Sequence, residues 1–126
     1  MELVTIVVML ALIEYFIFSL QVGMARGEFN VPAPQMTGHE VFERRHRVQM
    51  NTAEQLLIFV PAMFGFGHFV HDVGAAALGL LFIAGRALYS RSYVADPSSR
   101  TTGFMMGMVA NTVLVLGTIG GAAWRL

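Results

Sequence analysis

The chain has 126 residues, of which 56% are hydrophobic and 13% are charged, and its mean hydropathy is +0.63. Soluble domains carry about 25% charged residues, so this composition excludes an ordinary soluble protein and indicates an integral membrane protein. The formal net charge is zero, which gives no support for a nucleic-acid partner, and the absence of cysteine excludes disulfides, thiolate metal sites and a cysteine nucleophile.

The length leaves room for four membrane crossings, because each crossing needs about 20 apolar residues. The first is predicted at residues 3–25, a segment that is longer than the apolar core of a signal peptide and lacks its basic start. A long connection follows, in which Pro32, Pro34 and Gly38 prevent a continuous helix.

The second predicted helix starts at Val41 and continues for about 30 residues, or roughly 45 Å, which exceeds the thickness of the hydrocarbon core. Its first turns are therefore expected in the headgroup region and its span at residues 48–70. Pro61 lies inside this helix and is expected to kink it, which a membrane bundle tolerates when neighbouring groups satisfy the freed carbonyl.

The third and fourth spans are predicted at residues 73–93 and 102–124, with a turn at Asp96 and Pro97 between them. In the fourth span, pairs of glycines are spaced four residues apart, at 103 and 107 and again at 117 and 121. This spacing lets helix backbones approach closely. Residues 1–126 are thus expected to form a single all-α domain, a left-handed membrane bundle of four helices.

The arginines predict the orientation of the bundle. Six of the eight flank the first and third connections: Arg26, Arg44, Arg45, Arg47, Arg91 and Arg100. Because cytoplasmic loops are enriched in arginine, these two connections are expected in the cytoplasm and both termini outside. The polar ends of all four spans would then meet at one membrane face.

A polar stripe begins the second helix. Arg47, Asn51 and Glu54 are spaced i, i+4, i+7 and fall within an arc of roughly 60°. Gln49 points about 160° away from Asn51, so it can face only a cavity shared with a neighbouring subunit. Such polar residues at the entry to a span indicate a functional site, although a polar helix end that forms only a salt bridge explains the stripe equally well.

Arg86, Tyr89 and Tyr93 share one face of the third helix, near the cytoplasmic boundary. The two tyrosines therefore either belong to a functional site on this face or anchor the helix at the membrane interface. Arg100 follows them beside three candidate N-caps of the last helix: Ser98, Ser99 and Thr101. A guanidinium near a helix N-terminus would stabilise an anion, including a thiolate, and a surface arginine that snorkels is the alternative.

Glu14 lies within the first span, where an ionised carboxylate is costly. In this respect the chain resembles the small multidrug-resistance transporters, which couple protons to substrate through such a glutamate. The long, arginine-rich first connection does not fit those transporters. We favour a carboxyl group that is hydrogen-bonded or protonated within the bundle.

The histidines form no recognised metal motif, although His39, Glu43 and His46 have helical spacing and His68 and His71 are three residues apart. No metal site is therefore expected.

Residues 42–54, FERRHRVQMNTAE, closely follow the signature F-E-R-x-x-R-x-x-x-N-x-x-E of the MAPEG family, the membrane-associated proteins of eicosanoid and glutathione metabolism. SLQVGMAR precedes this string and RALYSRSY follows it, in the order that the family has. The chain thus resembles a MAPEG protein over nearly its whole length. The resemblance implies a homotrimer that binds glutathione at each subunit interface.

The resemblance also implies roles for individual residues. Five match positions that hold glutathione from one subunit: Arg47, Asn51, Glu54, Tyr89 and Tyr93. Arg26 and Gln49 match positions supplied by the neighbouring subunit, and Arg100 matches the arginine that stabilises the thiolate. The implied activity is a glutathione transferase, with peroxidase activity in addition, acting on hydrophobic electrophiles, hydroperoxides or lipids that enter from the bilayer.

Two departures narrow this expectation. Gly27 stands where the leukotriene-synthase branch has a second arginine, and Gln55 replaces a tyrosine of that branch. Both favour a broad transferase like those of the microsomal and bacterial branches. The family's non-catalytic lipid-binding branch lacks the arginine and glutamate present here as Arg47 and Glu54. A chain this compact favours a bacterial inner membrane, with the site facing the cytoplasm.

Overall fold

The computed structural model describes all 126 residues and consists of helices. The elements are α1 (Glu2–Glu28), α2 (Glu40–Phe69), α3 (Asp72–Ala95), the short 3-10 helix η1 (Pro97–Ser99) and α4 (Thr101–Trp124). The chain contains no strand, which confirms the all-α fold class.

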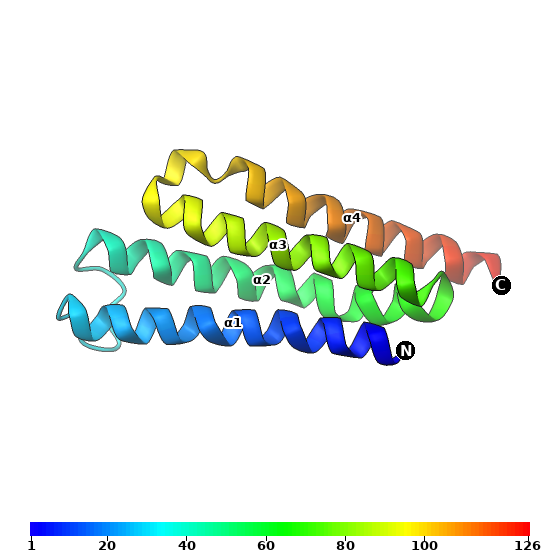
Figure 1. The fold of residues 1–126 in the computed structure, drawn as a ribbon, viewed down its shortest axis with the longest axis horizontal. Coiled ribbons are helices and arrows are strands. Elements are labelled where there is room, and N and C mark those ends of the chain that lie inside the picture. The colour runs from blue at the N-terminus through cyan, green and yellow to red at the C-terminus, as the bar shows by residue number, and fades with distance from the viewer.

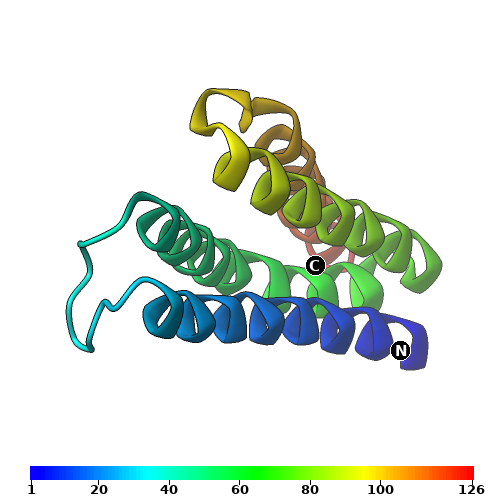
Figure 2. The ribbon, with the colours of Figure 1, turned by 60° about the vertical axis from the view of Figure 1, so that its left-hand side comes forward.

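Successive long helices run antiparallel, so both termini lie at one end of the bundle, and the α1–α2 connection and η1 lie at the other (Figure 1). α2 and α3 form the middle of the bundle, because each packs against both outer helices, whereas α1 and α4 lie on opposite sides (Figure 2). The first and third connections therefore share one end, as the sequence predicts. We call this the polar end.

Three segments are long and apolar enough to cross a membrane: α1, α3 and the η1–α4 segment Pro97–Trp124. α2, predicted as a fourth crossing, is not among them, because its first half carries charged side chains such as Arg44, Arg47 and Glu54. It still runs beside α1 and α3 as one continuous helix that includes Pro61. The chain is thus an integral membrane protein whose most polar long helix lies in the middle of the bundle.

The largest apolar cluster occupies the half of the bundle nearer the termini. The rings of Phe59 and Phe82 stack there with their centroids 4.0 Å apart. Val4, Met63 and Leu114 are fully buried around them. Because this half supplies most of the apolar packing, the other half, which holds two smaller apolar clusters, can also carry polar side chains.

Three of the four glycines singled out in α4 allow close helix packing. A Cβ atom at Gly103 would lie 2.4 Å from the backbone nitrogen of Tyr89, one at Gly117 would lie 2.4 Å from the Phe66 ring, and one at Gly121 would lie 2.7 Å from the Phe69 carbonyl oxygen. Gly107 has more room, since its nearest neighbours would be 3.8 Å away. The contact at Gly103 fixes the start of α4 against α3.

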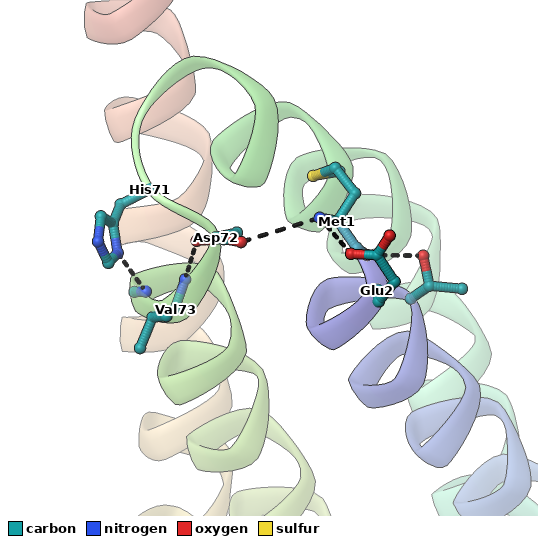
Figure 3. Close-up of polar contacts among 7 residues, drawn as sticks. Met1, Glu2, His71, Asp72 and Val73 are labelled. Carbon is teal, nitrogen blue, oxygen red and sulfur yellow. Dashed lines mark hydrogen bonds and ion pairs between the residues drawn. The ribbon is translucent and has the colours of Figure 1, made fainter.

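Polar contacts also close the end that holds the termini. The N-terminal ammonium lies 3.3 Å from Glu2 and 3.8 Å from Asp72, which joins the start of α1 to the α2–α3 turn (Figure 3). His71 Nδ1 accepts a hydrogen bond from the backbone N–H of Gly74 at 2.9 Å, and His39 Nδ1 accepts one from Val41 at 3.1 Å. These two histidines are helix caps in the structure.

Candidate functional site

Two adjoining cavities open at the polar end. The smaller, of about 570 Å³, is lined by residues of α2, α3 and the start of α4, including Arg47, Asn51, Tyr89, Tyr93 and Arg100. The larger, of about 910 Å³, extends along α2 toward the first connection and includes Glu54. Arg47, Tyr93 and Pro97 line both cavities, so the two form one polar groove.

The α2 stripe lies on one face of its helix, as its spacing predicts, with Arg47 and Glu54 exposed and Asn51 half-buried. Arg47 and Glu54 form an ion pair at 3.8 Å, and their side chains are 56% and 60% exposed. Such a solvent-accessible pair is weak, typically about 0–1 kcal/mol. The helix end therefore does form a salt bridge, yet both charged groups remain accessible to a ligand.

The two tyrosines of α3 differ in their surroundings. Tyr89 is only 3% exposed, and its ring stacks on that of Tyr93 with centroids 5.5 Å apart. Tyr89 packs with Phe18 and Val48, so it lies inside the bundle. This burial argues against an interfacial anchor at Tyr89.

The start of α4 differs from the prediction. Arg100 itself is the N-cap residue, and no side chain caps the helix. The predicted caps Ser98 and Ser99 belong to η1 instead, where the Ser98 hydroxyl donates to Asp96 and the Ser99 hydroxyl donates to backbone carbonyls. Thr101 is the first residue of α4, so it is not a cap either. The first N–H groups of α4 thus remain without a capping side chain next to Arg100.

Arg100 lines the smaller cavity, and its position is set by local hydrogen bonds. Its Nη1 donates to the carbonyl oxygen of Pro97 at 2.8 Å. Asp96 begins η1 by accepting from the Ser98 hydroxyl at 2.8 Å and from the Ser98 backbone N–H at 3.1 Å. These hydrogen bonds, with a smaller contribution from the Arg44 charge, hold the pKa of Asp96 below its usual value. The Asp96 carboxylate therefore keeps η1 in place at neutral pH.

Arg26 and Gln49 lie outside the polar groove of this chain. Arg26 Nη1 donates to the carbonyl oxygen of Gln35 at 2.7 Å, and its guanidinium lies 4.6 Å over the Phe42 ring. Gln49 Nε2 donates to Ser19 Oγ at 3.0 Å, on the side of α2 that faces α1. The angular separation expected between Gln49 and Asn51 is thus present.

Arg86 touches two groove residues, although the sequence assigns it no role in the site. It is 1% exposed, donates to Asn51 Oδ1 at 2.8 Å and lies 4.3 Å over the Tyr89 ring. A buried arginine inside a span is itself a signal of function, because such a charge is costly without partners.

Glu14 is half-buried on α1, and its Oε1 is buried without a hydrogen-bond partner. The sequence leads us to expect a carboxyl group that is either hydrogen-bonded or protonated, and the structure shows no hydrogen bond at this atom. Protonation of Glu14 stays a prediction.

Smaller cavities continue from the polar groove along α4. Phe104 lines both the groove and a cavity of about 330 Å³ that extends to Met108 and Val113. Met108 also lines a further cavity, of about 260 Å³, that reaches Leu116. Mostly apolar side chains line this path within the segment suited to cross a membrane.

Comparisons with known proteins agree on one family. The sequence model of the MAPEG family matches residues 4–120. An uncharacterized protein from Synechocystis sp. is 38% identical over 93% of this chain and 85% of its own length. Human microsomal glutathione S-transferase 2 is 38% identical over 82% of this chain and 71% of its own length. Leukotriene C4 synthase from Rattus norvegicus is 33% identical over 98% of this chain and 90% of its own length.

Proposed function

The chain belongs to the MAPEG family, and from this premise we propose that it is a membrane-bound glutathione transferase. One observation carries the proposal: Arg47, Asn51, Tyr89, Tyr93 and Arg100 converge on one cavity. The relatives named as a glutathione S-transferase and a leukotriene C4 synthase support glutathione as the thiol substrate. The chain has no cysteine, so its thiol chemistry depends on such a substrate.

The charges of the polar groove complement those of glutathione, which carries two carboxylates and one ammonium group. Arg47 is exposed enough to bind a carboxylate through two parallel hydrogen bonds, and Glu54 can pair with the ammonium. Asn51, Tyr89 and Tyr93 add neutral polar groups along the same groove. Binding at both ends of the tripeptide would hold its sulfur at a fixed point.

Arg100 is the residue that would activate the thiol. A cation and the uncapped N-terminus of α4 both favour an anion, so they lower the pKa of a thiol from about 8.5 and release its proton to solvent. The thiolate then attacks an electrophilic carbon, forming a C–S bond while the leaving group departs with its electron pair. Positioning and electrostatic stabilisation supply the catalysis.

Hydrophobic substrates would reach the sulfur from the bilayer along the apolar path on α4. Phe104 joins this path to the polar groove. A lipid hydroperoxide entering the same way would be reduced, because thiolate attack on oxygen breaks the O–O bond and releases an alkoxide, which takes up a proton to give an alcohol. A second glutathione would convert the resulting sulfenic acid to glutathione disulfide and water.

The exposed face of α2 supports assembly as a homotrimer. Six exposed residues follow one another at helical spacing along this face: Arg47, Met50, Glu54, Leu57, Ile58 and Pro61. The charged side chains of Arg47 and Glu54 on this face are better covered by protein than by lipid, and a copy of the same chain is the simplest partner. In a trimer, Arg26 and Gln49 would complete the groove of the neighbouring subunit. The arginines around the polar end favour its placement in the cytoplasm.

The test is glutathione-dependent turnover of an aryl halide by the purified protein, with Arg100→Ala alongside. We expect thiolate absorbance on glutathione binding, and a loss of roughly 10²–10³ in kcat in the variant. A parent protein that gives neither a thiolate signal nor turnover would refute the transferase. Proton-coupled cation uptake into vesicles, abolished by Glu14→Gln, would instead favour a transporter.

A further inference from the structure

Arg86 connects the interior of the bundle to the polar groove without lining the groove itself. Its Nε and Nη2 donate to the Thr52 hydroxyl at 3.2 and 2.8 Å, and Nη2 also donates to Asn51 Oδ1 at 2.8 Å. Thr52 is fully buried and Arg86 is 1% exposed. These bonds join α3 to α2 directly behind the site.

We propose that Arg86 is a positioning residue that determines which end of the Asn51 amide meets the ligand. A guanidinium has donors only, so the Asn51 atom in contact with it must be the carbonyl oxygen. With Oδ1 bound on the buried side, Nδ2 is left to face the groove, and there Asn51 donates. The inference rests on the proposed function and deepens it: Asn51 recognises an acceptor of glutathione, either a carboxylate or a peptide carbonyl.

Thr52 makes this orientation stable. Two N–H groups of the guanidinium meet one threonine oxygen, so the remaining hydrogen of Nη2 points to Asn51. If the hydroxyl were removed, the guanidinium would lose two of its three hydrogen bonds and could rotate away from Asn51. Thr52 therefore acts on the ligand only through Arg86 and Asn51.

The first experiment measures glutathione binding at equilibrium for the full-length protein and three variants: Arg86→Met, Asn51→Ala and the double variant. We expect each single change to weaken binding about tenfold, or about 1.4 kcal/mol. In the Asn51→Ala background, Arg86→Met should add at most about a threefold loss, because its main route of action is already gone. If the loss of affinity in the double variant equals the product of the losses in the two single variants, the proposal is overturned.

The orientation itself is tested by comparing Asn51→Asp with Asn51→Ala. Aspartate still offers Arg86 an oxygen, but it places a carboxylate oxygen where the N–H group had faced glutathione. Asn51→Asp should therefore bind glutathione more weakly than Asn51→Ala does. Binding by Asn51→Asp that equals or exceeds that of Asn51→Ala would show that the oxygen faces the groove, against the proposal.

Two controls keep the test valid if Arg86→Met fails to fold, which a thermal melt would reveal. Thr52→Val should weaken glutathione binding and Thr52→Ser should restore it, whereas equal binding by the two would refute the role of Arg86. Arg91→Met changes an exposed arginine on the same helix and should bind like the parent. If the parent binds no glutathione, the proposed function fails, whereas a parent that binds with fully independent losses refutes the positioning role alone.

Discussion

At the scale of single residues, the Arg47–Glu54 pair is a weak contact that a ligand could open. The two charged groups are 3.8 Å apart and mostly exposed, so separating them costs little. A ligand with a carboxylate and an ammonium can separate the pair, because its carboxylate binds Arg47 and its ammonium binds Glu54. The pair would therefore hold both side chains near their binding positions without competing strongly with glutathione.

This view predicts a specific loss in Glu54→Gln. The variant keeps the side-chain volume but cannot form an ion pair with the ammonium of glutathione, so we expect KM for glutathione to rise about tenfold with little change in kcat. Deaminated glutathione, which lacks that ammonium, provides the comparison. It should be a poor substrate for the parent and no worse for the variant.

The control for this prediction is Glu28→Gln, at the end of α1. Glu28 is exposed, forms no ion pair and lines neither cavity of the groove, so its neutralisation should leave both kinetic constants unchanged. An equal rise in KM for glutathione and for its deaminated analogue in Glu54→Gln would contradict the assigned pairing.

Residue spacing along one helix could be predicted from the sequence, whereas the side-chain partners on different helices could not. Arg47, Asn51 and Glu54 share a face because the helical repeat is fixed. Arg86 received no role in the site because its partner Thr52 is 34 residues away in the chain. Helical periodicity does not tell which faces of α2 and α3 meet, so the buried network that supports Asn51 is visible only in the folded bundle.

At the scale of elements, the α3–α4 contact sets where Arg100 lies relative to the tyrosines. Gly103 faces the backbone of Tyr89 and the carbonyl oxygen of Gly85, so the two helices touch within one turn of the groove. Glycine spacing in the sequence predicted close packing here. The helix cap was predicted wrongly because η1 takes up Ser98 and Ser99 before α4 begins.

We predict that Gly103→Ala lowers activity far more than Gly107→Ala does. The Cβ added at Gly103 would lie 2.4 Å from a backbone nitrogen and 2.7 Å from a backbone oxygen, so α4 must move away from α3 and carry Arg100 with it. We expect a loss of at least tenfold in kcat/KM and a lower melting temperature, since overpacking costs about 1–3 kcal/mol.

Gly107→Ala is the matched control, one helical turn further along α4. Its Cβ would meet only side-chain atoms at 3.8 Å, which is ordinary van der Waals contact. Activity and melting temperature should stay near those of the parent. Equal losses in the two variants would show that helix flexibility, and not the contact at Tyr89, limits the site.

At the scale of the whole molecule, the position of Arg26 is the strongest reason to test for a shared site. Within one chain its guanidinium is bound to the first connection and does not reach the groove. Periodicity along α2 indicated that Gln49 faces away from Asn51. No pattern in the sequence, however, gives the number of subunits in an assembly or their arrangement. Only a measurement on mixed assemblies separates a site within one chain from a site between chains.

Subunit complementation provides that measurement. If the proposed trimer shares its sites between chains, Arg26→Ala and Arg47→Ala should each be nearly inactive alone, because every site would then lack one arginine. In cells that express both variants equally, random assembly in a cyclic trimer gives roughly one quarter of the interfaces an intact Arg47 from one chain and an intact Arg26 from its neighbour. Turnover of the purified mixture should therefore recover to about a quarter of the parent value. If both arginines served the same chain's site, every site would stay defective and mixing would restore nothing, which would refute the shared site.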